Sequence, residues 1–143
     1  MEKDYALFVY GGDEVGSDLE VRRAVLDNDL ADRVFFHPNI KKEEESFLFS
    51  QSLGVIYPVL YESFPFTLNK ALFYHTPIIA SHISSVKSIF GGKIDYFNPV
   101  SKVDMTKSIA DFARKNHEID YSGITSSMSQ ENFLEEITKI IFS

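Results

Sequence analysis

The sequence has no cysteine, no tryptophan and no excess of basic residues, and these absences exclude several kinds of protein. Without cysteine there is no disulfide, no cysteine-ligated zinc or iron–sulfur cluster and no thiol nucleophile. The formal net charge of -7 argues against an extended nucleic-acid surface, because such surfaces cluster cations that displace counterions from phosphates. We therefore expect no nucleic-acid partner, although a local basic pocket remains compatible with this charge.

Long apolar runs are also absent, and no segment approaches the roughly 18 to 20 apolar residues that span a bilayer. The N-terminal residues M-E-K-D-Y lack the basic and apolar regions of a signal peptide. We expect a cytoplasmic protein, able to work peripherally at a membrane through the full-length protein. Hydrophobic residues at 44% and a length of 143 residues predict one folded domain, over 1–143.

Short apolar runs alternate with segments of helical period, which is typical of a parallel sheet covered by helices, the α/β class. Strands are predicted over residues 5–10, 33–37, 54–58, 77–81 and 94–97. Helices are predicted over residues 17–28, 41–51, 67–75, 103–116 and 130–142, with a polar loop over 118–128. The nearly continuous apolar character of the strands predicts that both faces of the sheet are covered.

Residues 54–81 form the most informative stretch, G-V-I-Y-P-V-L-Y-E-S-F-P-F-T-L-N-K-A-L-F-Y-H-T-P-I-I-A-S. This stretch predicts a buried strand, a turn with a lone carboxylate, a helix and a second buried strand. Glu62 therefore follows the carboxyl end of a strand and precedes a helix, which is where open α/β sheets bind ligands. A solvated turn acid, or a carboxylate that interacts with the helix N-terminus, would explain the same position.

The same stretch resembles the donor-binding half of retaining, nucleotide-sugar-dependent glycosyltransferases of GT-B architecture (glycosyl transferases group 1). Their signature runs roughly P-S-x-x-E-G-F-G-x-x-x-x-E-A-x-A-x-G-x-P-V-I-A-S. The residues in register with it are Pro58, Glu62, Phe64, Ala71, Pro77, Ile78, Ile79, Ala80 and Ser81. Similar segments cover nearly the whole chain, namely A-L-F-V-Y-G-G-D-E-V, D-R-V-F-F-H-P-N-I-K-K-E-E, K-I-D-Y-F-N-P-V-S-K-V-D-M and S-Q-E-N-F-L-E-E-I-T-K-I-I-F. The resemblance implies a Rossmann-like, doubly wound parallel sheet in three layers, with about five strands.

The resemblance also implies that Glu62 is the catalytic residue, in contact with hydroxyls of the donor sugar near the anomeric carbon. A carboxylate can accept hydrogen bonds from two vicinal hydroxyls and stabilise positive charge that develops on the sugar. The remaining donor contacts implied are Ser63, Phe64, Pro65, Phe66, Thr67 and Lys70, the nucleobase loop Pro38, Asn39 and Ile40, and the tight turn at Gly11 and Gly12.

Backbone N–H groups of the turn 63–67, at a helix N-terminus, suit a phosphate or sugar oxygen. The alternative is that Ser63 or Thr67 caps the helix and Pro65 starts it. Pro65 in any case removes one N–H donor.

Two positions depart from the family pattern in charge. Lys70 stands where the family has a second glutamate, which accepts hydrogen bonds from the nucleotide ribose, and an ammonium has no acceptor. Lys70 can instead pair with a phosphate, or it is a solvated helix lysine. Lys87 or Ser88 occupies the place of a further glutamate that the family often has.

One strand–helix unit of the family, which carries basic residues that hold the donor diphosphate, has no counterpart before Tyr5. Its strand would be central, because the doubly wound order is 3-2-1-4-5-6, and buried unpaired backbone groups are costly. We therefore expect a fragment of a longer enzyme, two sheet halves that close up directly, or a partner chain or second copy that fills the gap. The N-terminal acceptor domain is missing too, so this chain alone is expected to be inactive.

The histidines give no independent signal. His75 and His82 flank the second buried strand without a zinc-ligand spacing, and we predict no metal site. His37 at a strand end is more typical of a structural role. No G-x-S-x-G motif supports a hydrolase.

Taken with the resemblance, these residues imply a hexosyltransferase-type enzyme of polysaccharide biosynthesis. Its donor-binding domain would take a UDP- or GDP-linked sugar and pass it, with retention, to a glycan or lipid-linked acceptor, with no further cofactor. The alternative is a catalytically degenerate module that binds a glycan or a partner chain.

Overall fold

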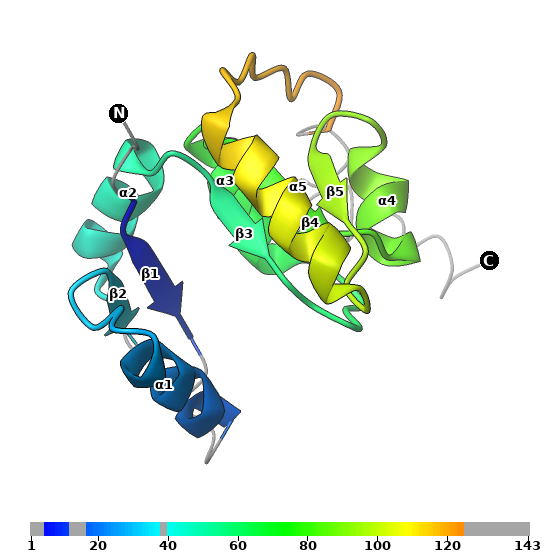
Figure 1. The fold of residues 1–143 in the computed structure, drawn as a ribbon. Helices are drawn as coiled ribbons and strands as arrows, with labels where there is room; N and C mark the ends of the chain where they lie inside the picture. Colours follow the sequence, from blue (N-terminus) through cyan, green and yellow to red (C-terminus); the bar gives the residue numbers. More distant parts are fainter. Residues whose placement is uncertain (1–4, 12–16, 38–39, 125–143) are drawn as a thin grey trace, which may run out of the picture. The chain divides into compact units, whose positions relative to one another are not determined.

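The structure of the protein is a computed structural model that describes residues 5–11, 17–37 and 40–124. The chain divides into two compact units, residues 1–45 and 46–143. Strands and helices alternate along the described residues (Figure 1). Their order is β1 (Leu7–Tyr10), α1 (Ser17–Asp27), β2 (Val34–His37), α2 (Lys42–Gln51), β3 (Val55–Tyr57), α3 (Phe66–Phe73), β4 (Ile78–Ser81), α4 (Ser84–Phe90), β5 (Asp95–Phe97) and α5 (Lys102–Arg114). All strand pairs are parallel, which confirms the predicted α/β class.

The first unit contains a two-stranded sheet, in which β1 pairs with β2 from Leu7 opposite Val34 to Tyr10 opposite His37. Phe8 stacks on Phe35 with ring centroids 5.2 Å apart. Leu7 and Phe8 are each 45% exposed, so this sheet leaves much apolar side-chain surface accessible. Gly11, directly after β1, has a φ of +88°, a conformation that glycine adopts without steric cost.

The second unit has a three-stranded sheet in the order β3-β4-β5, covered on both faces. Side chains alternate between the faces of a strand, so Ile78 and Ala80 of β4 face one way and Ile79 the other. One cluster joins β4 to α3 and α4, and the other joins Ile79 and Phe97 to Phe112 of α5. Figure 1 shows α5 on one face, with α3 and α4 on the opposite face. The predicted three layers and doubly wound arrangement are thus present in this unit.

The five predicted strands and the first four predicted helices are confirmed, with bounds that shift by a few residues. Helix α5 begins where expected because the Ser101 side chain accepts a hydrogen bond from the Asp104 N–H at 3.2 Å, an N-cap interaction. The helix predicted over 130–142 lies outside the described residues.

The structure differs from the prediction at two places. The first is helix α4, which the sequence did not predict because three of its seven residues are serines, with modest helix propensity. Tertiary packing supports it instead, since Val86 and Phe90 are buried in the core. The loop predicted as polar over 118–128 has no regular element over 118–124, but Tyr121 and Ile124 are buried at 6% and 4% exposure.

Among the described strands, the pairings form a two-stranded sheet, β1-β2, in the first unit and a three-stranded sheet, β3-β4-β5, in the second. Direct closure of the two sheet halves, a fragment of a longer enzyme and a partner chain that fills the gap all stay predictions. Within the described part of the chain, no helix combines the length and apolar composition that a membrane crossing requires.

Candidate functional site

The candidate site is the turn between β3 and α3, where Glu62 is held by two hydrogen bonds. The Tyr57 hydroxyl, at the end of β3, donates to Glu62 Oε2 at 2.8 Å. The Phe64 backbone N–H donates to Glu62 Oε1 at 3.2 Å. The carboxylate is only partly buried, so it is oriented by the fold and still accessible to a ligand.

Tyr57 acts as a hydrogen-bond donor over the whole neutral range. Burial raises the pKa of Tyr57 well above the usual value of about 10. The hydrogen bond to Glu62 and the negative charge of that carboxylate raise it further. Each cause disfavours the phenolate, because removing the proton would leave two negative oxygens in contact.

A second element fixes the backbone of the same turn. The Ser85 hydroxyl of α4 donates a hydrogen bond to the Glu62 carbonyl oxygen. Within α4, the Ser88 hydroxyl donates a hydrogen bond to the Ser85 carbonyl at 2.9 Å. Glu62 is therefore tied to the carboxyl ends of both β3 and β4, where ligands of open α/β sheets bind.

The start of α3 offers fewer free amides than an ideal phosphate cradle. Pro65 occupies the N-cap position, and no side chain caps the helix. The predicted alternative that Ser63 or Thr67 is the cap is therefore wrong, and the Ser63 hydroxyl instead lies 3.3 Å from the Tyr61 hydroxyl. The N–H groups of Phe66 and Leu68 donate within the turn, to the carbonyls of Phe64 and Pro65.

The turn that carries Glu62 is rich in large apolar side chains. Large apolar side chains around the turn stay exposed, with Leu60 at 71%, Tyr61 at 83% and Phe66 at 65%. Phe64 packs on Phe66, with ring centroids 4.5 Å apart. Thr67 and Lys70 follow on α3 and are half-buried. The predicted residues of the second unit thus follow one another along the β3–α3 turn and the first half of α3, namely Glu62, Ser63, Phe64, Pro65, Phe66, Thr67 and Lys70.

The other predicted donor contacts belong to the first unit or lie outside the described residues. Gly11 and Ile40 belong to the first unit, and Ile40 is half-buried there. Gly12, Pro38 and Asn39 lie outside the described residues. Lys87, predicted for the same cleft, places its ammonium 4.4 Å from the centre of the Tyr96 ring, a cation–π contact.

A pocket of about 410 Å³ lies at the carboxyl ends of β4 and β5, and sequence reasoning did not predict it. It is lined by His82, Tyr96, Phe97, Asn98 and Asp104. Asp104 accepts a hydrogen bond from the Asn98 N–H at 2.7 Å, and His82 meets the Tyr96 ring edge-on at 5.4 Å. The sequence could have indicated this pocket, because His82 and Asn98 directly follow the apolar runs that form β4 and β5.

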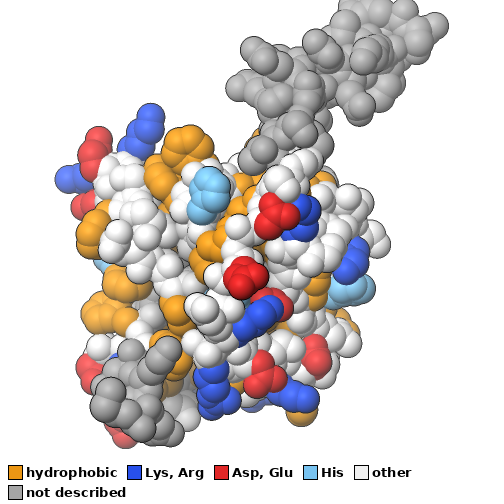
Figure 2. Space-filling model, turned by 90° about the horizontal axis from the view of Figure 1, so that it is seen from above, with side chains coloured by type: hydrophobic (Ala, Val, Ile, Leu, Met, Phe, Trp, Pro, Cys, Tyr) orange, Lys and Arg blue, Asp and Glu red, His pale blue; other side chains and the backbone are white. Residues whose placement is uncertain are grey.

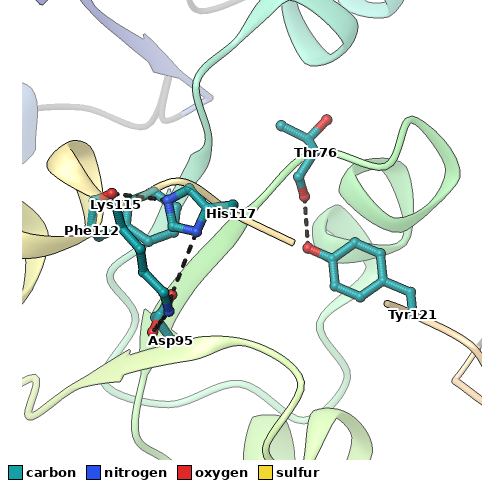
Figure 3. Close-up of polar contacts among 6 residues, drawn as sticks. All are labelled: Thr76, Asp95, Phe112, Lys115, His117 and Tyr121. Atoms are coloured by element: carbon teal, nitrogen blue, oxygen red, sulfur yellow. Dashed lines mark hydrogen bonds and ion pairs between the residues drawn. The ribbon is translucent and has the colours of Figure 1, made fainter. Parts of the chain in front are cut away.

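A separate polar cluster lies at the opposite, amino end of the sheet (Figure 3). Asp95 at the start of β5 accepts hydrogen bonds from Lys115 Nζ at 2.9 and 3.0 Å, and His117 Nδ1 lies 3.8 Å away. His117 Nε2 is 2.9 Å from the Phe112 carbonyl, which can only accept, so Nε2 carries the proton. These contacts fasten the end of α5 to β5, a structural role.

Charge is not concentrated on the face seen in Figure 2, where acidic and basic side chains are intermixed among the coloured residues. No three His, Asp or Glu side chains gather to hold a metal ion in the described ranges. The chemistry available at the Glu62 turn is therefore hydrogen bonding and charge stabilisation by a carboxylate.

Comparison with known proteins identifies the class. The model of the family glycosyl transferases group 1 matches residues 1–116, and the chain therefore belongs to this family. Among solved structures, sucrose-phosphate synthase from Thermosynechococcus elongatus is similar, with 24% identity and a TM-score of 0.62. The likeness covers 76% of this chain and 29% of that one, and it shows the shared Rossmann-like fold. No curated protein matches this chain.

Proposed function

We propose that this chain is the donor-binding domain of a glycosyltransferase that transfers a sugar from a nucleotide sugar to a glycan or lipid-linked acceptor, with retention. One observation carries the proposal most directly. Glu62 stands at the carboxyl end of β3, oriented by Tyr57 and Phe64, in a chain of the glycosyl transferases group 1 family. The proposal includes a cytoplasmic location.

The chemistry asked of Glu62 matches its surroundings. Its carboxylate would accept hydrogen bonds from vicinal hydroxyls of the donor sugar and stabilise the positive charge that grows as the bond to the diphosphate breaks. The acceptor hydroxyl would then bond to the anomeric carbon on the same face. Its proton would pass to the departing phosphate oxygen, so this chain need not supply a separate acid and base.

The proposal is tested by titrating the isotope-labelled chain with UDP, GDP, ADP and their sugar conjugates, while amide NMR shifts are recorded. We expect saturable shifts over residues 62–70 with one nucleotide family, and larger shifts with its sugar conjugate than with the bare nucleotide. A folded chain in which no nucleotide or conjugate moves these amides would contradict a donor site at this turn.

A degenerate binding module is the second candidate, and the α3 start favours it. Pro65 has no N–H, and the Phe66 and Leu68 amides are already bonded, so few amides remain for a phosphate. This candidate predicts that a glycan without a nucleotide shifts the amides of residues 60–66, while no nucleotide does. The two candidates thus give opposite results in one series of titrations.

A further inference from the structure

Tyr57 is a residue that the donor contacts implied by the family resemblance do not include. It is the last residue of β3, five positions before Glu62, and its hydroxyl reaches across the turn to Glu62 Oε2 at 2.8 Å. The ring packs against the main hydrophobic cluster. A packed ring holds its hydroxyl in one place, so the bond to Glu62 has a fixed anchor in the sheet.

The hydrogen bonds of Glu62 divide evenly between its two oxygens. An ionised carboxylate offers about four acceptor positions, two on each oxygen. Tyr57 occupies one on Oε2 and Phe64 one on Oε1, which leaves about one position on each oxygen. Two adjacent acceptors on one planar group are what a pair of vicinal sugar hydroxyls needs.

We propose that Tyr57 is a positioning residue for Glu62, which sets the rotation of the carboxylate so that its two remaining acceptor positions face the vicinal hydroxyls of the donor sugar. This inference rests on the proposed function, since it assigns a role within the same site. Tyr57 itself need not touch the donor. Ser85 supports the same geometry from α4, because its hydroxyl holds the Glu62 carbonyl.

The inference predicts a loss that is specific to the sugar. Without the phenol, the carboxylate is held by the Phe64 N–H alone, and rotation would misdirect the acceptor meant for one hydroxyl. Under the proposed function, Glu62 contacts the sugar part of the donor, and the nucleotide part would make no contact with this bond. Affinity for the sugar conjugate should therefore fall while affinity for the bare nucleoside diphosphate stays unchanged.

The test uses Tyr57→Phe in the full chain, because phenylalanine keeps the ring and removes only the hydroxyl. Dissociation constants are measured by calorimetry for the nucleoside diphosphate and the sugar conjugate that bind the unmodified chain. We expect about tenfold weaker binding of the sugar conjugate, the effect of one hydrogen bond to a charged group. Equal losses for both ligands, or no loss for either, would overturn the positioning role.

Tyr121→Phe is the matched control, since it also removes one tyrosine hydroxyl from a hydrogen bond, here one donated to the Thr76 carbonyl at 2.8 Å. It should leave both dissociation constants unchanged. Ser85→Ala provides a second variant, and it should reproduce the sugar-specific loss in smaller degree.

A measurement without ligand separates this inference from the proposed function. The Phe64 amide should change its NMR shift in Tyr57→Phe, because the carboxylate that it contacts turns, and it should keep its shift in Tyr121→Phe. An unmoved Phe64 amide would overturn the inference even if the donor binds. If the unmodified chain binds no sugar nucleotide, the proposed function fails, and the role assigned to Tyr57 fails with it.

Discussion

Glu62 and Asp95 are two carboxylates at opposite ends of one sheet, and their partners differ in charge. Glu62, beyond the carboxyl end of β3, accepts hydrogen bonds from a phenol and a backbone amide. Asp95, at the amino end of β5, accepts two from the Lys115 ammonium and has His117 nearby. Both side chains are fixed in place, but the groups that hold Glu62 are neutral.

On the proposed function, this difference separates a carboxylate that binds a ligand from a structural one. A cation beside a carboxylate neutralises its charge and takes its acceptor positions. Neutral donors orient the carboxylate and leave its negative charge available for a polar ligand. Position agrees with this distinction, since the carboxyl ends of parallel strands bind ligands.

Among the changes that test this difference between Glu62 and Asp95, we expect the largest effect from Glu62→Ala, on the affinity for the sugar conjugate. Removing the carboxylate takes away two hydrogen bonds to sugar hydroxyls, so sugar-conjugate affinity should fall about a hundredfold. The change is measured by calorimetry with the conjugate that binds the unmodified chain. Unchanged affinity would show that the two carboxylates do not differ in function, and Asp95→Asn serves as the control that should keep full affinity.

Gly54→Ala tests the amino end as a region that serves stability. A Cβ at Gly54 would lie 2.5 Å from the Phe112 ring and 3.1 Å from the Pro77 carbonyl, which forces α5 away from the sheet. We expect the free energy of unfolding to fall by about 2 kcal/mol, as for other overpacked cores, in urea denaturation followed by circular dichroism. Gly92→Ala is the control, because nothing lies within 4 Å of its added Cβ. Equal stability of both variants would contradict this packing.

Tyr121, at the amino end of the sheet, should make the free energy of unfolding depend on pH in the alkaline range. Burial raises the pKa of Tyr121 to about 12, above the unfolded value of about 10. Its stabilising contribution is complete below pH 10 and is lost as the pH rises towards 12, because the unfolded chain releases this proton first. Between these values the contribution of Tyr121 to the free energy of unfolding should fall by about 1 kcal/mol per pH unit.

Tyr121→Phe removes this titrating group and should make the decline between pH 10 and 12 less steep, while Tyr57 and Tyr96, whose pKa values are also raised, still contribute to it. The variant should also lose about 1 kcal/mol at pH 8, where the hydroxyl donates to the Thr76 carbonyl. Urea denaturation at a series of pH values measures both effects. An equally steep decline in the variant would show that Tyr121 does not contribute to the pH dependence.

Asp95→Asn should have the smallest effect. The Lys115 and Asp95 side chains are 54% and 37% exposed, and ion pairs at such exposure contribute about 0.5 kcal/mol. Added salt should reduce the difference between variant and unmodified chain. A loss as large as that of Gly54→Ala would mean that this pair contributes far more than its exposure suggests.

The strands could be predicted from the sequence because they are apolar runs with clear ends. The run from Pro77 to Ser81 predicted β4, whose four residues are all buried. Helix α4 could not be predicted in this way, because its serines give no strong helical signal. The burial of Val86 and Phe90 that stabilises it depends on neighbours distant in sequence.

In the candidate site, too, one part could be predicted from the sequence and another could not. The position of Glu62 after an apolar run predicted its place at the carboxyl end of a strand, and this needed only local pattern, although β3 is half-buried and not buried as predicted. Its partners were not predicted, because the Tyr57 bond crosses a turn and the Ser85 bond joins residues 23 apart in sequence. The N-cap also required the structure, because Pro65 occupies it without any side-chain cap.

The middle position of β4 has a consequence for how the second unit opens. Its backbone is paired on both sides, with β3 and β5, and its residues are fully buried. In local unfolding, segments of this kind release their amide protons last, while segments at an edge exchange earlier. Hydrogen exchange should therefore be slowest in β4, and the turn that carries Glu62, attached to the edge strand β3, can open for a ligand while the centre of the sheet stays closed.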